Sequence, residues 1–390
     1  MIFTYILYNT ILFSNIAFLF LAEKTKHYKY IFLFLSFLII FFPAAIRYNI
    51  GADYFSYVNI FNEIKSSPEG YHKELGFLWI NQLLIYLNLG PQSLFVFTSF
   101  IIYIFTYLSF PQKNKLLFSF IFITTFYLVS FNLVRTAIVY SISLAIFSNI
   151  YFKKNNLILN TLLFIFGFLI HKSILLILAI PIISFLIPSK LLKNRLFIIA
   201  TYILVLILFY NRNEMISILM SFDFIKNIGY SRYINSVYLS QTKINSGIGI
   251  ILSIIPFIWI TIFSRHLITF NNKNKYIVIS SLIYIFAIMC SSSFVLLSRI
   301  ERTFIFIIPI SIYAFYSCGN IRKIVRLSFT IYIIIWYLLL FETNINIFRS
   351  DVCAGSRVSP YVSIFNKEDD KSLKIIHSEC LKNEIKKNAH

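Results

Sequence analysis

A few ionisable side chains interrupt an otherwise apolar sequence, and they are of types that bind anions or transfer protons. They are Arg47, Asp53, Arg135, His171, Arg299 and Arg302. Guanidinium groups stay charged, desolvate more easily than ammonium groups and offer a planar fork to phosphate oxygens. A neutral histidine or a carboxylate can take a proton from a hydroxyl group. The set predicts a site that binds an anionic group such as a pyrophosphate and activates a hydroxyl.

Each of these residues also has a plainer interpretation. An arginine at the end of a membrane span can extend its side chain to the lipid head groups. His171 can be a structural hydrogen-bonding residue, and Asp53 can cap its loop or pair with Arg47. The functional interpretation requires these residues to lie close together on one side of the membrane. Whether they do depends on the predicted helices that contain them and on the orientation of those helices.

The composition identifies the class of protein. Of the 390 residues, 58% are hydrophobic and only 13% are charged, and a soluble globule of this size cannot bury so much apolar surface. We therefore predict an all-α, polytopic integral membrane protein. Twelve apolar runs approach the length of about 20 residues that a membrane span needs. They lie at roughly 2–22, 30–46, 91–110, 115–131, 134–152, 156–171, 172–187, 196–211, 247–264, 275–291, 303–318 and 326–343.

Loop charges set the orientation of these helices. If EKTKHYK faces the cytoplasm, the loops on that side hold 16 of the 35 Lys and Arg residues and one of the 15 acidic residues. This bias is typical of cytoplasmic loops and accounts for the net charge of +20 without nucleic acid. We predict a transmembrane domain over 1–343, with outward loops at 47–76, 212–246 and 292–302, and an outward tail over 344–390.

In this orientation, the four arginines and His171 all lie at outward ends of predicted helices. Ionisable groups near membrane depth are costly and usually face a cavity or a partner. Arg299 and Arg302 share a helix face because they are three residues apart. Arg135 and Arg302 also lie near helix N-termini, whose free N–H groups favour an anion. We therefore predict one outward cavity that contains all five residues.

Two other outward features carry structural predictions. The stretch 75–90 is amphipathic and too short and too polar to span comfortably, so we expect a helix that lies along the outer face or dips into it. Cys353 and Cys380 both lie in the predicted outward tail, where an oxidising compartment would allow a disulfide. Two unpaired thiols remain the alternative, because the spacing alone does not give the pairing geometry.

Several signatures of other chemistries are absent from the sequence. It has no P-loop, no G-x-G-x-x-G, no D-x-D, no H-E-x-x-H and no G-x-S-x-G. A cytosolic nucleotide donor therefore has no predicted site, and neither a metal nor a cofactor is implied.

The polar segments resemble, in order, those of a known family. RYNIGADYFSYVNIF resembles the Arg-x-x-x-Gly-x-Asp-Tyr-x-x-Tyr segment of the EpsG/Wzy-like polysaccharide polymerases. NLVRTAIVYSISLAIF, FLIHKSILLIL and SRIERTFIFIIPI are similar to the later Arg, Phe-His-x-Ser and Arg segments of that family. The resemblance covers roughly residues 30–320, together with a late SPYVSIF.

The resemblance implies an O-antigen or exopolysaccharide polymerase with a GT-C-like helical bundle in the bacterial inner membrane. Such an enzyme transfers a glycan from undecaprenyl pyrophosphate to a lipid-linked repeat unit on the periplasmic side. Membrane lipids and a chain-length regulator protein are its further expected partners. The arginines would then hold the pyrophosphate, and His171 or Asp53 would be the base. Tyr54 and Tyr57 would stack on sugars, unless they belong to an interfacial aromatic belt.

Three other functions remain open from the sequence. An O-antigen ligase would use the same chemistry on a different acceptor. A flippase or exporter of lipid-linked oligosaccharide would also need basic residues and many spans, but would place charges within its helices and often show internal repeats. A membrane acyltransferase would also place a histidine near the membrane surface, but no site for an acyl donor is visible.

Overall fold

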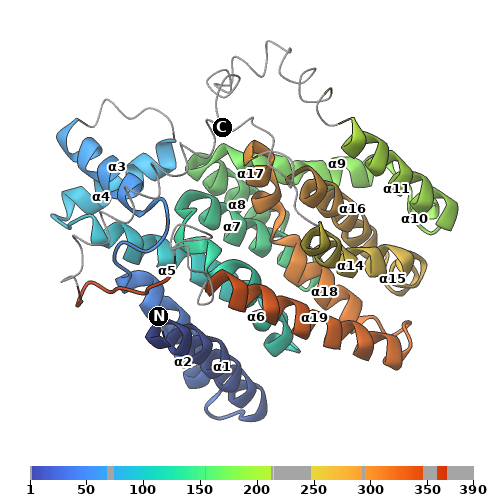
Figure 1. The fold of residues 1–390 in the computed structure, drawn as a ribbon, viewed down its shortest axis with the longest axis horizontal. Helices are drawn as coiled ribbons and strands as arrows, with labels where there is room; N and C mark the ends of the chain where they lie inside the picture. The colour runs from blue at the N-terminus through green and yellow to red at the C-terminus, as the bar shows by residue number, and fades with distance from the viewer. Residues whose placement is uncertain are drawn as a thin grey trace. The chain divides into compact units, whose positions relative to one another are not determined.

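A computed structural model describes residues 2–67, 74–153, 155–211, 214, 247–291, 295–345 and 358–366 (Figure 1). The elements in this part of the chain are helices, joined by turns and one isolated β-bridge between Arg47 and Ser363. The chain divides into two compact units, one of Met1–Ile174 with Tyr337–His390 and one of Leu175–Trp336. The all-α prediction is confirmed for the described residues.

The first unit contains the predicted outward segment 47–76 and the helices around it. Its helices are α1 (Ile2–Lys24), α2 (Lys29–Ile46), α3 (Tyr54–Ser66), α4 (Leu75–Tyr86), α5 (Gln92–Leu108), α6 (Lys115–Phe122), α7 (Val134–Tyr151) and α8 (Leu157–Ile170). A π-helical turn (Ile123–Tyr127) and a 3-10 turn (Val129–Phe131) connect α6 to α7. Helix α5 packs against α2 and α7, and α4 packs against α3, α5 and α8.

The second unit begins within the 3-10 helix Lys172–Leu178, which follows α8. Its other helices are α9 (Ala179–Leu186), α10 (Ser189–Leu192), α11 (Arg195–Tyr210), α14 (Ile248–Ile262), α15 (Ser264–Phe270), α16 (Asn274–Ser291), α17 (Val295–Phe304), α18 (Ile307–Ser317) and most of α19 (Lys323–Ile345). Helix α16 is central to this unit, because α9, α14, α15, α17 and α18 all pack against it. The last turns of α19 belong to the first unit.

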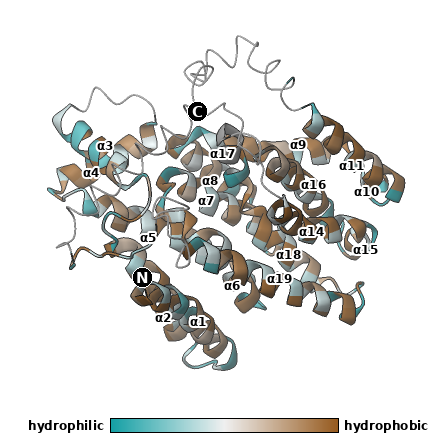
Figure 2. Cartoon of the chain, viewed as in Figure 1, coloured by the Kyte–Doolittle hydropathy of each residue, from teal (hydrophilic) through white to brown (hydrophobic). Residues whose placement is uncertain are grey.

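Five helices in the described part of the chain are long and apolar enough to cross a membrane, namely α1, α2, α7, α16 and α19. The bent pair α14 and α15, at 56°, would make a sixth span. All twelve predicted runs are helical, but the other apolar helices have only 10–17 residues, so a count of about twelve spans stays a prediction. The predominantly apolar helices (Figure 2) are consistent with a multi-pass membrane protein.

Helix α3 was not predicted, because its segment was interpreted as an outward loop, and α17 begins before the predicted helix end that carries Arg299 and Arg302. Helix α3 buries Tyr54, Tyr57, Phe61 and Ile64, which recur every three or four residues along one face. Polar residues on the opposite face, such as Glu63, give the segment its loop-like composition. The predicted helix in 75–90 is confirmed as α4, which ends at Tyr86.

Gly51 forms the turn that connects α2 to α3. Its φ of +97° is in a region that residues with a Cβ rarely adopt. A Cβ at this position would also lie 2.6 Å from the Phe131 carbonyl oxygen. The next amide, Ala52 N, donates to Asn132 Oδ1 at 2.5 Å and fixes the turn against the segment before α7.

We expect Gly51→Ala to lower the free energy of unfolding by about 1–3 kcal/mol, because both the φ and the close carbonyl oppose a side chain. Thermal unfolding of the detergent-solubilised protein measures this change. Gly90→Ala is the matched control, since a Cβ there meets nothing within 4 Å. Equal stability of the two variants would contradict the role of Gly51.

The late SPYVSIF segment packs on the end of α2. Tyr48 N donates to Val362 O and Ile364 N donates to Ile46 O, both at 2.9 Å. Tyr361 Oη donates to Pro43 O at 2.8 Å. This segment therefore supports the polypeptide around Arg47. Cys353 and Cys380 lie outside the described residues, so their disulfide stays a prediction.

Candidate functional site

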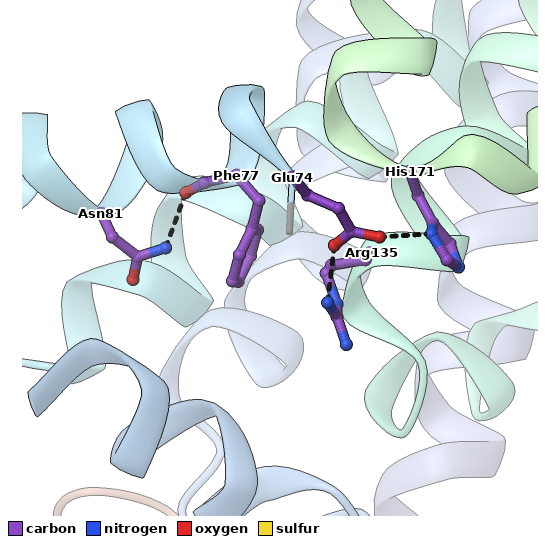
Figure 3. Close-up of polar contacts among 5 residues, drawn as sticks. All are labelled: Glu74, Phe77, Asn81, Arg135 and His171. Atoms are coloured by element: carbon purple, nitrogen blue, oxygen red, sulfur yellow. Dashed lines mark hydrogen bonds and ion pairs between the residues drawn. The ribbon is translucent and has the colours of Figure 1, made fainter. Parts of the chain in front are cut away.

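Glu74 brings together two of the predicted site residues in the first unit. It immediately precedes α4, Arg135 lies in the first turn of α7, and His171 ends α8. The Glu74 carboxylate contacts Arg135 Nη1 through Oε2 at 2.5 Å and His171 Nδ1 through Oε1 at 2.5 Å (Figure 3). We call these three residues the Glu74 cluster.

Two residues of the cluster, Arg135 and His171, have partly exposed side chains, and the third, Glu74, is largely buried. The side chains of Arg135 and His171 are 28% and 32% exposed, whereas that of Glu74 is 9% exposed. Burial alone raises the pKa of the Glu74 carboxyl, but its close contact with His171 and the charge of Arg135 outweigh burial and hold the pKa below its usual value. Glu74 is therefore ionised at neutral pH, and Arg135 and His171 remain accessible to a ligand.

Close packing of α4 against α8 places Glu74 within contact distance of His171. A Cβ at Gly76 would lie 2.9 Å from the backbone carbonyl carbon of Leu169, so the absence of a side chain lets α4 touch α8. This contact is two residues from Glu74 along α4 and two residues from His171 along α8. His171 N donates to Gly167 O at 2.9 Å, which ties the histidine backbone to the last turn of α8.

Aromatic rings support the arginine of the cluster. The Arg135 guanidinium lies 5.6 Å from the ring centre of Phe77 and 5.8 Å from that of Tyr57. Both distances are in the range of cation–π contacts. Phe77 lies in the first turn of α4, three residues after Glu74. One turn later, Asn81 Nδ2 donates to Phe77 O at 2.7 Å (Figure 3). Helices α3 and α4 thus hold Arg135 beside Glu74.

Arg47 is placed differently from Arg135, because its side chain is buried. It is 2% exposed, and its guanidinium lies 5.0 Å from the ring centres of both Phe95 and Phe131. Nη1 donates to Ala44 O and, at 3.2 Å, to Ser99 Oγ. No carboxylate contacts this guanidinium within the described part of the chain. In this structure Arg47 is a core residue that packs against Phe95 and Phe131.

The tyrosines of the motif are also buried. Tyr54 stacks on Phe95 at 4.3 Å between ring centres, and its hydroxyl donates to Gln92 Oε1 at 2.9 Å. Tyr57 packs against Phe77 and below Arg135. Stacking of either ring on a sugar would require these contacts to open. Their predicted sugar contacts stay predictions.

Asp53, the second predicted base, immediately precedes α3, and its carbonyl accepts from Tyr57 N at 3.1 Å. Burial raises the pKa of the Tyr57 hydroxyl, and Asp53 raises it further, while Arg135 lowers it. Asp53 and Arg135 thus both act electrostatically on Tyr57. A role of Asp53 as base stays a prediction.

The remaining two predicted residues belong to the second unit. Arg299 and Arg302 both lie on α17, which agrees with the prediction that they share one helix, and the Arg302 side chain is partly exposed. The side chain of Arg299 lies outside the described part of the chain. A single cavity that contains all four arginines and His171 stays a prediction.

Glu74 is the functional candidate that sequence reasoning missed. It lies within 47–76, which the sequence predicts as an outward loop, and nothing in its local sequence marks it. The signal that could have identified it is chemical. Glu74 is an acid beside the start of an apolar helix, and Gly76 follows two residues later and allows another helix to approach closely.

The lowered pKa of Glu74 predicts a pH-dependent stability. A carboxyl whose folded pKa is depressed stabilises the fold above its unfolded pKa of about 4.3, and this stabilisation is lost as the pH falls through the lower folded value. We expect Glu74→Gln to unfold at a lower temperature than wild type at neutral pH. The gap between the two melting temperatures should shrink as the pH falls from about 5 to about 3. A gap that stays constant across this range would contradict the ion pairs.

A family model described as the EpsG family matches residues 30–363, which is most of the chain and includes the whole Glu74 cluster. No curated protein and no solved structure matches the chain significantly.

Proposed function

The chain belongs to the EpsG family, which implies a role in exopolysaccharide synthesis, and from this premise we propose that it is a polysaccharide polymerase. It transfers a glycan from a polyprenyl pyrophosphate to a lipid-linked repeat unit at the outer face of the bacterial inner membrane. The donor is undecaprenyl pyrophosphate-linked, and O-antigen is the alternative product class. The proposal requires neither a metal nor a cofactor.

The observation that carries this proposal is the pairing of an anion-binding group with a proton acceptor. Arg135 and His171 are far apart in the sequence, yet both contact the same carboxylate at 2.5 Å. Each keeps an exposed side-chain fraction of about a third. A substrate that reaches one of them is therefore within reach of the other.

The chemistry assigns one task to each group. The acceptor hydroxyl oxygen attacks the anomeric carbon of the donor glycan, and its proton passes to His171. The bond between the anomeric carbon and the pyrophosphate oxygen breaks, and polyprenyl pyrophosphate leaves with its negative charge. Arg135 binds that charge through its guanidinium fork.

Deletion of the protein in its host distinguishes the remaining functions. Loss of a polymerase leaves single lipid-linked repeat units on the outer leaflet and no long polysaccharide. Loss of a flippase would leave the single units on the inner leaflet, and loss of a ligase would leave long polymer on the carrier lipid. Either of the last two results would contradict the proposal.

Orientation in the membrane is a separate prediction. Cysteines introduced at Ser66, which is exposed, and at Ser363, which is beside Arg47, should react with an impermeant thiol reagent added to intact spheroplasts. The background for this labelling is a variant in which the four native cysteines are replaced. Labelling only after permeabilisation would reverse the predicted topology.

A further inference from the structure

The proposed transfer gives tasks to Arg135 and His171 but none to Glu74, which lies between them. Glu74 occupies the N-cap position of α4, where a carboxylate ordinarily accepts from its own helix. Its side chain makes no such capping bond. Both of its oxygens are directed instead to the neighbouring helices, one to Arg135 and one to His171. Its position therefore serves the cluster and not its own helix.

The contact between Glu74 and His171 determines which ring nitrogen can act as the base. An ionised carboxylate only accepts hydrogen bonds, so the position of Nδ1 at 2.5 Å from Glu74 Oε1 favours the tautomer that carries its proton on Nδ1. In a neutral imidazole the lone pair is then on Nε2. That nitrogen can accept the proton of the acceptor hydroxyl.

We propose that Glu74 is a positioning residue that holds His171 as the Nδ1–H tautomer and stabilises the imidazolium formed when Nε2 takes the acceptor proton. This inference rests on the proposed polymerase function. During the step, the hydroxyl proton moves to Nε2, the Nδ1 proton stays in place, and Glu74 remains ionised. The second oxygen of Glu74 holds Nη1 of Arg135, the group that binds the leaving pyrophosphate in the proposed function.

The packing around the cluster makes this role specific. Helices α4 and α7 both pack against α8. This packing brings Glu74 and Arg135 to the C-terminal end of α8, where His171 lies. Lys172, next in the chain, is exposed. Glu74 is thus the negative group of the cluster, and its removal would take away the carboxylate that both His171 and Arg135 contact.

The kinetic test compares Glu74→Gln and Glu74→Asp with wild type in a glycan-extension assay. We expect Glu74→Gln to lower kcat at least about 10-fold, with a smaller change in KM for the lipid-linked donor. The acidic limb of its pH–rate profile should move from that of wild type, because the negative charge beside the base has been removed. Glu74→Asp restores the charge and should return the limb toward wild type. Glu63→Gln, at an exposed residue of α3, is the matched control and should behave as wild type.

A spectroscopic test does not depend on turnover. Nitrogen-15 chemical shifts of labelled histidine, assigned by the loss of a signal in His171→Gln, report the tautomer directly. The wild-type His171 should be the Nδ1–H form, and Glu74→Gln should populate a mixture. A wild-type Nε2–H form, or an unchanged tautomer and pH limb in Glu74→Gln, would overturn the inference. If no glycan is extended by the wild type, the polymerase proposal fails while this measurement still decides the role of Glu74.

Discussion

Replacement of His171 by glutamine will reduce the rate of glycan extension by about 100- to 10,000-fold, the usual contribution of a general base. Glutamine keeps polar atoms near Glu74 but cannot accept the proton at the pH of the reaction. The measurement is the initial rate of extension in membranes that contain the variant, with a single lipid-linked repeat unit as substrate. Binding of the lipid-linked donor should change little, because Arg135 is retained.

The control for this experiment is His27→Gln, at an exposed histidine that follows α1. This variant should extend glycans at the wild-type rate. If His171→Gln is folded and also extends normally, His171 is not the base. In that case a folded but inactive Asp53→Asn would move the assignment to Asp53. Activity in both variants would contradict this account of the site.

The second large effect separates two arginines that look alike in the sequence. Arg47→Ala should lower the free energy of unfolding by about 2–4 kcal/mol, because it removes a buried side chain and its hydrogen bonds from between two phenyl rings. Arg135→Ala should leave the protein folded but lose extension, since its guanidinium is partly exposed. Thermal unfolding and extension rate, measured on both variants, test this division.

Lysine substitutions sharpen the comparison. Arg135→Lys keeps the charge but not the planar fork, so extension should fall, though less than in Arg135→Ala. Arg47→Lys should unfold more easily than wild type, because an ammonium group does not stack between rings as a guanidinium does. If Arg135→Lys extends at the wild-type rate, the guanidinium only reaches toward the lipid head groups. If Arg47→Ala is as stable as wild type, the buried placement of Arg47 has no structural importance.

The helical character of the chain could be predicted from its sequence because apolar runs bounded by basic or polar turns are a strong signal. Helices α1, α2 and α7 match their predicted runs closely. Helix α3 could not be predicted in the same way, because its buried face alternates with polar residues. The predicted runs 156–171 and 172–187 meet at His171, and the structure places this histidine at the C-cap of α8.

The site was predictable only in part. Arg135 and His171 stood out because ionisable residues are rare at the ends of apolar helices. Their meeting point was not predictable, since it depends on Gly76 letting α4 approach α8 and on Glu74 turning away from its own helix. Arg47 has the same sequence signal as Arg135, yet it is buried between Phe95 and Phe131. Side-chain type at a helix end does not distinguish a core residue from an exposed one.

The most direct test of the central claim uses the purified protein in lipid vesicles with one chemically defined, lipid-linked repeat unit. We expect the wild type to produce glycans of two or more repeats still attached to the carrier lipid, with one polyprenyl pyrophosphate released for each bond formed. Under the same conditions, His171→Gln should bind the substrate and leave it as a single repeat. Folded wild-type protein that binds the repeat unit but never extends it, or that only moves it between leaflets, would contradict the account.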